Sequence, residues 1–261
     1  MISGGLRIKG IEKKSTLGKP LITVVTVVYN GATTLEQTIQ SVVNQSYDNK
    51  EYIIIDGAST DGTLDIIKKY EDKIDYWQSE PDEGIYDAMN KGLACAKGDF
   101  LIFIGADDLI FSPNTLNACS QMMSDKTKNY YGDVYLNEHR FIYDYKFSKI
   151  KLCCRNICHQ AIFYSKKTYK KRKFETQYKI YADWAYNLES WNEGFEYIPQ
   201  TVCIFNELGS SQKGDETFLK DKKMLIQNNF GKSTYCFYRI FNCFSRLAYF
   251  IEHIIAMYKY R

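Results

Sequence analysis

The sequence predicts an α/β protein whose mixed, mostly parallel sheet is flanked by helices. Apolar runs rich in β-branched residues alternate with segments of helical periodicity through the first half of the chain, as in a parallel sheet with crossover helices. Three of these runs lead into acidic loops. Because open α/β sheets bind ligands outside the carboxyl ends of their strands, the same pattern also places a candidate site.

The first two strands are short apolar segments followed by helices. Residues 21–30, LITVVTVVYN, are typical of a strand buried on both faces, and the apolar residues of 34–45 recur on one helical stripe. Residues 51–56 form the second apolar run, which ends at Asp56 before a loop rich in Gly, Ser and Thr. This order predicts neighbouring parallel strands joined by a helix.

Two more strands follow, and the second ends in adjacent carboxylates. Residues 74–78 precede a loop that contains Asp82, and residues 99–108, DFLIFIGADD, end at Asp107 and Asp108. Turn formation beside Gly explains Asp82 well but explains the adjacent pair poorly. Neighbouring anions repel each other, and desolvating an unpaired carboxylate is costly. The pair therefore predicts a compensating positive charge at this strand end.

The second half of the chain has a different pattern. Residues 129–164 alternate aromatic with polar residues, which predicts mixed or antiparallel strands. The basic segment 165–173 leads to a helix with Asp183 in its first turn and Gly194 at its end. An acidic residue in a first turn is often only a favourable charge at the helix dipole, so this alternative stands beside a catalytic role.

The C-terminal residues 233–261 have the periodicity of an amphipathic helix. Their apolar residues recur at spacings of three and four, and Arg239 and Arg246 lie on another face. Three alternatives are open for this helix: a membrane interface, a second subunit in a homo-oligomer, or the surface of the chain's own folded domain.

The composition excludes several classes of protein. At 261 residues, of which 45% are hydrophobic, the chain can bury a sizeable core. A net charge of +3 is too small to indicate nucleic-acid binding as the main activity. The amino terminus has no apolar signal-peptide core, so the eight cysteines favour a reducing cytoplasm over a disulfide framework. No stretch is apolar for long enough to predict a membrane span.

Four motifs, taken together and in order, resemble the family 2 glycosyltransferases, which act on nucleotide sugars and have the GT-A fold. The likeness covers roughly residues 19–211. Its motifs are V-V-Y-N at 27–30, I-D-G-A-S-T-D-G-T at 55–63, D-E-G-I-Y-D-A-M-N-K-G at 82–92 and A-D-D at 106–108.

The resemblance implies a division of the chain into three parts. Residues 1–18 are a basic leader, and residues 19–212 are the GT-A catalytic domain. Within this domain, residues 19–111 bind the nucleotide sugar and residues 112–212 bind the acceptor. Residues 213–261 are the helical C-terminal tail.

The resemblance also implies a set of donor-binding residues. It places the backbone near Val27 and the side chain of Tyr29 beside the base and ribose, and it makes Asp56 the carboxylate that hydrogen-bonds the base. Asp82 and Asp107 complete the set.

The adjacent carboxylates correspond to the D-x-D motif of this family, which holds a divalent cation against the donor diphosphate. The missing positive charge would thus be Mg²⁺ or Mn²⁺. Gly105 replaces the first Asp of the motif, and Met89 replaces an Arg that many relatives have. Whether Asp107 or Asp108 contacts the metal stays open, with Asp107 favoured.

The acceptor side resembles the family at H-Q-A-I-F, residues 159–163, and at A-D-W, residues 182–184. The resemblance makes Asp183 the general base that takes a proton from a sugar hydroxyl. Displacement from the opposite face would then invert the anomeric centre. His159 has two readings, a contact to diphosphate or acceptor and a purely structural residue.

These observations predict an inverting, metal-dependent glycosyltransferase, a hexosyl- or N-acetylhexosaminyltransferase. It would move a sugar from a nucleotide donor, with UDP favoured, to a lipid-linked oligosaccharide in cell-surface polysaccharide biosynthesis such as that of O-antigen or capsule. We expect it at the cytoplasmic face of the membrane. Its tail would contact an anionic membrane surface through Arg239, Arg246, Lys259 and Arg261.

Two rival functions remain. A nucleotidyltransferase would need a basic, Gly-rich loop after the first strand, and YNGATTLEQ has neither Lys nor Arg. A non-catalytic nucleotide-sugar-binding assembly subunit would keep the fold and lose the chemistry, which the Gly105 replacement makes a real alternative.

Overall fold

The computed structural model describes residues 1–143, 145–207 and 214–259, with side chains as far as residue 241. Its strands are β1 (Ile2–Gly4), β2 (Ile22–Val28), β3 (Lys50–Asp56), β4 (Tyr76–Ser79), β5 (Phe100–Phe103), β6 (Leu109–Ile110), β7 (Asn129–Leu136), β8 (Phe141–Tyr143), β9 (Ile162–Ser165) and β10 (Phe195–Phe205). Its helices are α1 (Leu35–Val43), α2 (Thr63–Lys69), α3 (Ile85–Cys95), α4 (Thr115–Met122), α5 (Lys149–Cys154), α6 (Lys166–Tyr169), α7 (Ala182–Ser190) and α8 (Glu216–Lys259), with 3₁₀ turns η1 (His159–Ala161) and η2 (Trp191–Glu193).

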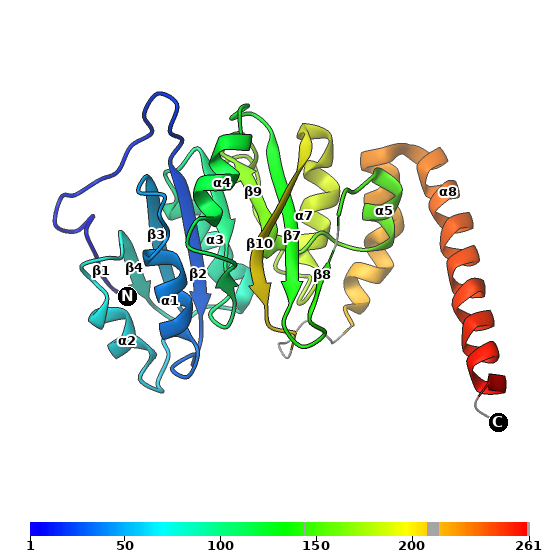
Figure 1. Ribbon diagram of the computed structural model, residues 1–261, viewed down its shortest axis with the longest axis horizontal. Helices are drawn as coiled ribbons and strands as arrows, with labels where there is room; N and C mark the ends of the chain where they lie inside the picture. Colours follow the sequence, from blue (N-terminus) through cyan, green and yellow to red (C-terminus); the bar gives the residue numbers. More distant parts are fainter. Residues whose placement is uncertain (144, 208–213, 260–261) are drawn as a thin grey trace.

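Within the described residues, the strands form one sheet in the order β1-β4-β3-β2-β5-β9-β7-β10-β6, with β8 paired to β7 (Figure 1). Strands β4, β3, β2 and β5 are parallel, as are β7 and β10, whereas β9 is antiparallel to both its neighbours. The register pairs Val28 with Asp56, so that β2 and β3 end side by side. This arrangement confirms the predicted mixed α/β fold with a mostly parallel central sheet.

The central strands are mostly apolar because helices cover both faces of the sheet. Val24 and Val25 of β2 are both fully buried and belong to different core clusters, since successive strand residues point to opposite faces. One cluster contains apolar residues of α1 and α4, and the other contains those of α3, α5 and α7. A continuous apolar run is therefore the correct signal for a strand in this position.

Among the described residues, three strands lie outside the segments for which the sequence predicted them: β1, the two-residue β6 and β10. β1 belongs to the basic leader and pairs antiparallel with β4. β10 lies between β7 and β6, and its register shifts between Tyr197 and Thr201, around Pro199. Proline cannot donate a ladder hydrogen bond, so an internal Pro weakens the strand signal in the sequence.

Helix α8 confirms the predicted C-terminal helix and is broken at Gly231, whose φ of 86° is not helical. Before the break, Phe218 and Ile226 are fully buried in the core that α5 and α7 share. After it, the chain turns and runs back along the edge of the molecule (Figure 1). Tyr235 and Tyr238 still pack against that core, whereas Phe237 and Phe241 are exposed. The side chains of Arg246, Lys259 and Arg261, predicted to meet a membrane, lie outside the described part of the chain.

The helices in the described residues include no segment that is both long enough and apolar enough to span a bilayer.

Candidate active site

A cleft of about 890 Å³ opens at the carboxyl ends of the central strands. Every predicted site residue except Asp56 lines it: Val27, Tyr29, Asp82, Asp107, Asp108, His159 and Asp183. These residues come from the end of β2, from the loops after β2, β4 and β5, from η1 and from α7. The sheet topology thus gathers positions that are far apart in the sequence.

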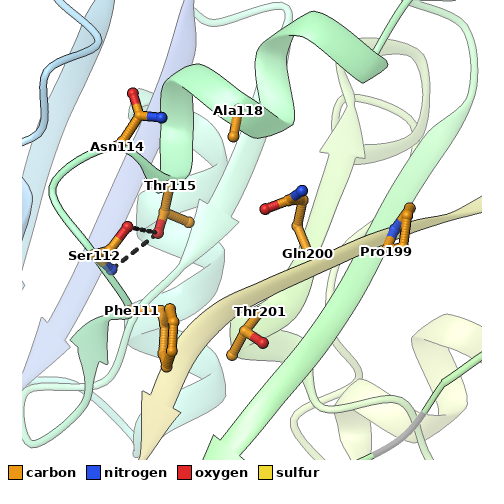
Figure 2. A pocket seen from close by; sticks show the side chains of 8 residues that line it. All are labelled: Phe111, Ser112, Asn114, Thr115, Ala118, Pro199, Gln200 and Thr201. Carbon is orange, nitrogen blue, oxygen red and sulfur yellow. Dashed lines mark hydrogen bonds between the residues drawn. The ribbon is translucent and has the colours of Figure 1, made fainter.

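A second, smaller hollow of about 280 Å³ lies between α4 and β10. Figure 2 shows its lining, where Ser112 N–H donates to Thr115 Oγ1 over 2.9 Å. Its walls contain no acidic, basic, histidine or cysteine side chain. Of these two hollows, only the larger cleft is lined by acidic, basic, histidine and cysteine side chains.

Asp56 lies behind the cleft rather than in its lining. Its carboxylate is fully buried and accepts the backbone N–H of Ser59 at 3.2 Å, together with the hydroxyls of Ser59 and Ser79. These donors order the loop after β3. The Asp82 carboxylate packs against that loop at Gly57, where an added Cβ would lie only 2.5 Å from Asp82 Oδ2. A contact between Asp56 and a nucleotide base stays a prediction.

The structure distinguishes the two adjacent carboxylates. Asp107 is exposed at the cleft, whereas Asp108 is 1% exposed and points back into the protein. Asp108 accepts from Gln160 Nε2 at 2.9 Å and from the N–H groups of Asn206 at 2.9 Å and Gly105 at 3.2 Å. Burial, with the nearby Asp107 charge, raises the pKa of Asp108 to about 6.

Gly105 is required by this inward orientation of Asp108. A Cβ at position 105 would lie 2.5 Å from Asp108 Oδ2, so a side chain there would displace the carboxylate. The replacement of the first Asp of D-x-D by glycine and the burial of the last Asp are thus two parts of one local arrangement. The carboxylate left facing the cleft is that of Asp107.

No lysine or arginine forms an ion pair with Asp107 or Asp108 within the described residues. Nor do these residues gather three His, Cys, Asp or Glu side chains into a metal cluster. One exposed carboxylate beside a second, buried one fits a hard cation that takes its remaining ligands from water and phosphate. Asn206 Nδ2 contacts Asp107 Oδ2 at 3.3 Å.

Asp183 stands on another wall of the same cleft and is 8% exposed. Its Oδ1 accepts from Trp184 N at 2.9 Å and from the Tyr86 hydroxyl at 3.1 Å. Its Oδ2 accepts from Asn156 Nδ2 at 2.8 Å and lies 3.1 Å from His159 Nδ1. Burial and the neighbouring Asp183 raise the pKa of Tyr86, so this hydroxyl remains a proton donor.

The η1 turn links the two acidic positions. His159 contacts Asp183, and the next residue, Gln160, contacts Asp108. Gln160 is itself oriented by Cys158, whose thiol donates to Gln160 Oε1 over 2.9 Å. Gln160 belongs to the H-Q-A-I-F motif, but nothing in the sequence indicated its contact with the acidic pair.

The basic segment 165–173 does not lie at the cleft. β9 is antiparallel to β5 with Ser165 opposite Phe100, so the segment follows at the amino end of β5, away from the acidic loop. Lys170 Nζ donates to the carbonyl oxygens of Leu93 and Ala94 at the end of α3. Other cations of the segment, Lys171 and Arg172, pair with Glu193.

Solved structures share this fold. Staphylococcus aureus TarS in complex with UDP-GlcNAc has a TM-score of 0.67 and 18% identity, over 80% of this chain and 66% of that one. A mannosyltransferase from Pyrobaculum calidifontis in complex with GDP-Man and Mn²⁺ has a TM-score of 0.58 and 20% identity, over 82% of this chain and 64% of that one. The chain spans only 41% of a longer TarS chain.

Sequence comparisons are consistent with the geometry. A "PGL/p-HBAD biosynthesis glycosyltransferase" of Mycobacterium bovis BCG is 31% identical over 216 residues, which are 78% of this chain and 84% of that protein. The family description "Glycosyl transferase family 2" matches residues 23–195, from the first residues of β2 to the start of β10. With a GT-A fold and this match over most of its length, the chain belongs to glycosyl transferase family 2.

Proposed function

We propose that the protein is an inverting glycosyltransferase that moves a sugar from a UDP-sugar to a lipid-linked saccharide during cell-surface polysaccharide biosynthesis. The observation that carries the proposal is that Asp107 and Asp183 line one cleft while having different surroundings. Asp107 is exposed and has no cationic partner among the described residues, which suits a metal and a diphosphate. Asp183 is nearly buried among neutral donors and one histidine, which suits a base.

The donor would occupy the side of the cleft formed by the loops after β2 and β4. Val27 and Tyr29 would contact the base and ribose, with Tyr29 66% exposed and available for stacking. The support for a nucleotide donor is the bound UDP-GlcNAc of TarS and the bound GDP-Man of the Pyrobaculum enzyme. Asp82 would form the wall of the donor site next to the loop after β3.

Asp107 would hold a Mn²⁺ or Mg²⁺ ion, with Asp108 supporting the loop from behind. When bound, such an ion neutralises charge on the departing nucleoside diphosphate. Asp107 supplies the exposed oxygen ligand, and the hydrogen bonds that Asp108 accepts from Gln160 and Asn206 keep the turn in place. The Mn²⁺ reported with the Pyrobaculum enzyme supports this choice of metal.

Asp183 would take the proton of the acceptor hydroxyl as that oxygen attacks the anomeric carbon. A sugar hydroxyl is a poor nucleophile at neutral pH, so a carboxylate within hydrogen-bond reach lowers the barrier. Attack opposite to the departing diphosphate inverts the configuration. His159, which contacts Asp183, would lie beside either the acceptor or the diphosphate.

The acceptor would be presented at the cytoplasmic face of a membrane, with the tail as the point of attachment. Phe237, Ile240 and Phe241 are exposed on the helix after Gly231, and Arg239 lies among them. Apolar side chains beside basic ones suit an anionic membrane surface, and a second subunit is the alternative. A Bacillus subtilis relative named for teichuronic acid biosynthesis, 41% identical over 93 residues, supports a cell-surface polysaccharide as the product.

The test is a panel of UDP-glucose, UDP-galactose, UDP-GlcNAc, GDP-mannose and UTP, each with Mn²⁺ or with a chelator. Binding at a hundredfold excess over the dissociation constant adds about 2.7 kcal/mol of stability, which a thermal shift detects. We expect a Mn²⁺-dependent shift with one UDP-sugar and release of UDP when a saccharide acceptor is added. Release of pyrophosphate from UTP when a sugar 1-phosphate is added, with formation of the UDP-sugar, would favour a nucleotidyltransferase. Binding without turnover would favour an assembly subunit.

A further inference from the structure

A chain of polar side chains runs from the protein core to Asp183. It begins at the hydroxyl of Tyr164 on β9, which donates to Asn187 Oδ1 over 2.9 Å. Asn187, on α7, donates through Nδ2 to Asn156 Oδ1 over 2.9 Å. Asn156, just after α5, donates through Nδ2 to Asp183 Oδ2 over 2.8 Å. Three elements of the fold thus converge on one carboxylate.

The direction of every hydrogen bond in this chain follows from its end at Asp183. An ionised carboxylate only accepts, so Asn156 must present its amide nitrogen and is left with an oxygen facing Asn187. Asn187 must then present its own nitrogen to Asn156, which leaves its oxygen facing Tyr164. Burial raises the pKa of Tyr164 well above its usual value, so the hydroxyl keeps the proton that it donates. This series of hydrogen bonds ends in an N–H donated to Asp183, which stabilises the ionised form of its carboxyl group.

Packing alone does not explain why these hydrogen-bonded polar side chains are buried. Tyr164 and Asn187 are both fully buried, and Asn187 lies one helical turn after Asp183 on α7. Phenylalanine and leucine would fill nearly the same space without polar atoms to satisfy. A fully satisfied polar chain, by contrast, fixes the orientation of its members.

We propose that Asn156 and Asn187, anchored by Tyr164, are positioning residues that keep the Asp183 carboxylate ionised and in one orientation at the cleft wall. The inference rests on the proposed role of Asp183 as the general base. A hydrogen bond donated to a carboxylate stabilises its charged form, so loss of the Asn156 donor shifts the equilibrium of Asp183 towards the protonated form. A protonated Asp183 is no longer a base.

Other charged or titratable groups lie around Asp183. Tyr86 on α3 and His159 on η1 contact it directly. Asp215 accepts the N–H of Ile180 close to Tyr86, and the ammonium of Lys222 on α8 lies 3.6 Å from the centroid of the Trp184 ring. The variants that test the proposal leave all of these groups in place.

The test is the double variant Tyr164→Phe/Asn187→Leu, which removes both buried polar partners together and so keeps the loss of stability small. We expect the acid limb of the pH profile of kcat/KM, measured with the UDP-sugar found active in the panel, to move to higher pH by about one unit. The KM for the UDP-sugar should stay unchanged, because the donor binds elsewhere in the cleft. A ¹³C NMR titration of labelled aspartate carboxyls provides a readout without turnover, with Asp183→Asn to identify the signal.

The matched control is Tyr186→Phe. Tyr186 is also fully buried on α7 and packs edge-on against Tyr164, but its hydroxyl points to the carbonyl of Thr168. This variant should leave the acid limb in place. If the double variant does not fold, Asn156→Ala at the cleft wall removes the direct donor and should give the same shift.

The outcomes separate this proposal from the proposed function. An unmoved acid limb and carboxyl titration in the double variant and in Asn156→Ala, with Asp183→Asn inactive, would overturn the positioning chain alone. Near-normal turnover by Asp183→Asn would overturn the general base, and the positioning proposal with it.

Discussion

Carboxylates lie at both ends of the central sheet, and the two ends neutralise them differently. At the amino end, Glu51 and Asp75 are almost fully buried, and the leader supplies a cation to each. Arg7 pairs with Glu51, and Lys13 Nζ lies 2.9 Å from Asp75 Oδ2. At the carboxyl end, Asp107 and Asp108 have no such ion pair within the described residues. The chain itself supplies cations to Glu51 and Asp75 at the amino end, whereas Asp107 at the carboxyl end faces the cleft without a cation from the described residues.

The hydrogen bonds reinforce this contrast. Glu51 also accepts from Thr23 Oγ1 at 2.6 Å and from Lys97 N at 2.9 Å, so its charge is fully matched by the chain. Asp183 at the cleft accepts from neutral amide and hydroxyl donors, with His159 beside it. Neutral donors fix the orientation of a carboxylate without forming an ion pair with it. Such a carboxylate can accept a proton without first losing a cationic partner. The difference lies in the partners, since both groups are buried.

The largest effect is expected at Asp183. Asp183→Asn should lower transfer by about two to four orders of magnitude, because an amide cannot take the acceptor proton. The contacts also predict a loss of stability of about 1–3 kcal/mol, since donors face both oxygens and the new amide nitrogen must meet one of them. Turnover and urea unfolding measure the two effects separately. Near-normal turnover with the stability loss alone would reduce Asp183 to a structural residue.

The next effect tests the amino end of the sheet. Arg7→Met should destabilise the protein by about 3–5 kcal/mol, because it leaves the buried Glu51 carboxylate without its cation. Denaturant unfolding measures this, and the exposed Lys9→Met is the matched control. Adding Glu51→Gln should recover much of the loss. Below its unfolding temperature, Arg7→Met should have close to normal transfer activity. A loss of activity as large as the loss of stability would contradict the view that the amino end of the sheet serves stability and the carboxyl end serves activity.

The third prediction concerns Asp107. Asp107→Asn should reduce Mn²⁺-dependent kcat/KM by about a hundredfold, because one electrostatic contact to the developing charge is lost. Unfolding should be unaffected because the side chain is exposed. Asp72→Asn, another exposed acid, is the control. Full activity of Asp107→Asn in the presence of a chelator would show that the carboxyl end of the sheet does not work through a metal.

The smallest effect is a pH dependence of stability due to Asp108. Its pKa is raised to about 6 in the folded protein, so between about pH 4 and pH 6 the folded state keeps a proton that the unfolded state has lost. The stability that this group contributes is therefore complete below about pH 4 and is lost as the pH rises towards 6. The loss is about 2–3 kcal/mol, and it should be smaller in Asp108→Asn. Equal pH dependence of the two proteins in denaturant unfolding would refute this assignment.

The sequence alone was informative wherever a local pattern had one physical cause. The β-branched run that became β2 could only be a strand covered on both faces, and Asp82, Asp107 and Asp183 entered the candidate site through motifs in a fixed order. The adjacent carboxylates predict a missing cation from electrostatic repulsion, and the cation itself stays a prediction. The leader gave no comparable signal, because Arg7 and Lys13 meet carboxylates that are 44 and 62 residues away in the chain.

Only the tertiary structure decided how Asp107 differs from Asp108 and how Asp56 differs from Asp107. Asp107 and Asp108 are chemically identical neighbours, and only the approach of Gln160, Asn206 and the Gly105 backbone makes one of them buried. Asp56 has a motif as clear as that of Asp107, but Ser59 and Ser79 enclose it behind the cleft. A sequence pattern depends on residues near in the chain, whereas burial and the partners of a charge depend on segments that only folding brings together.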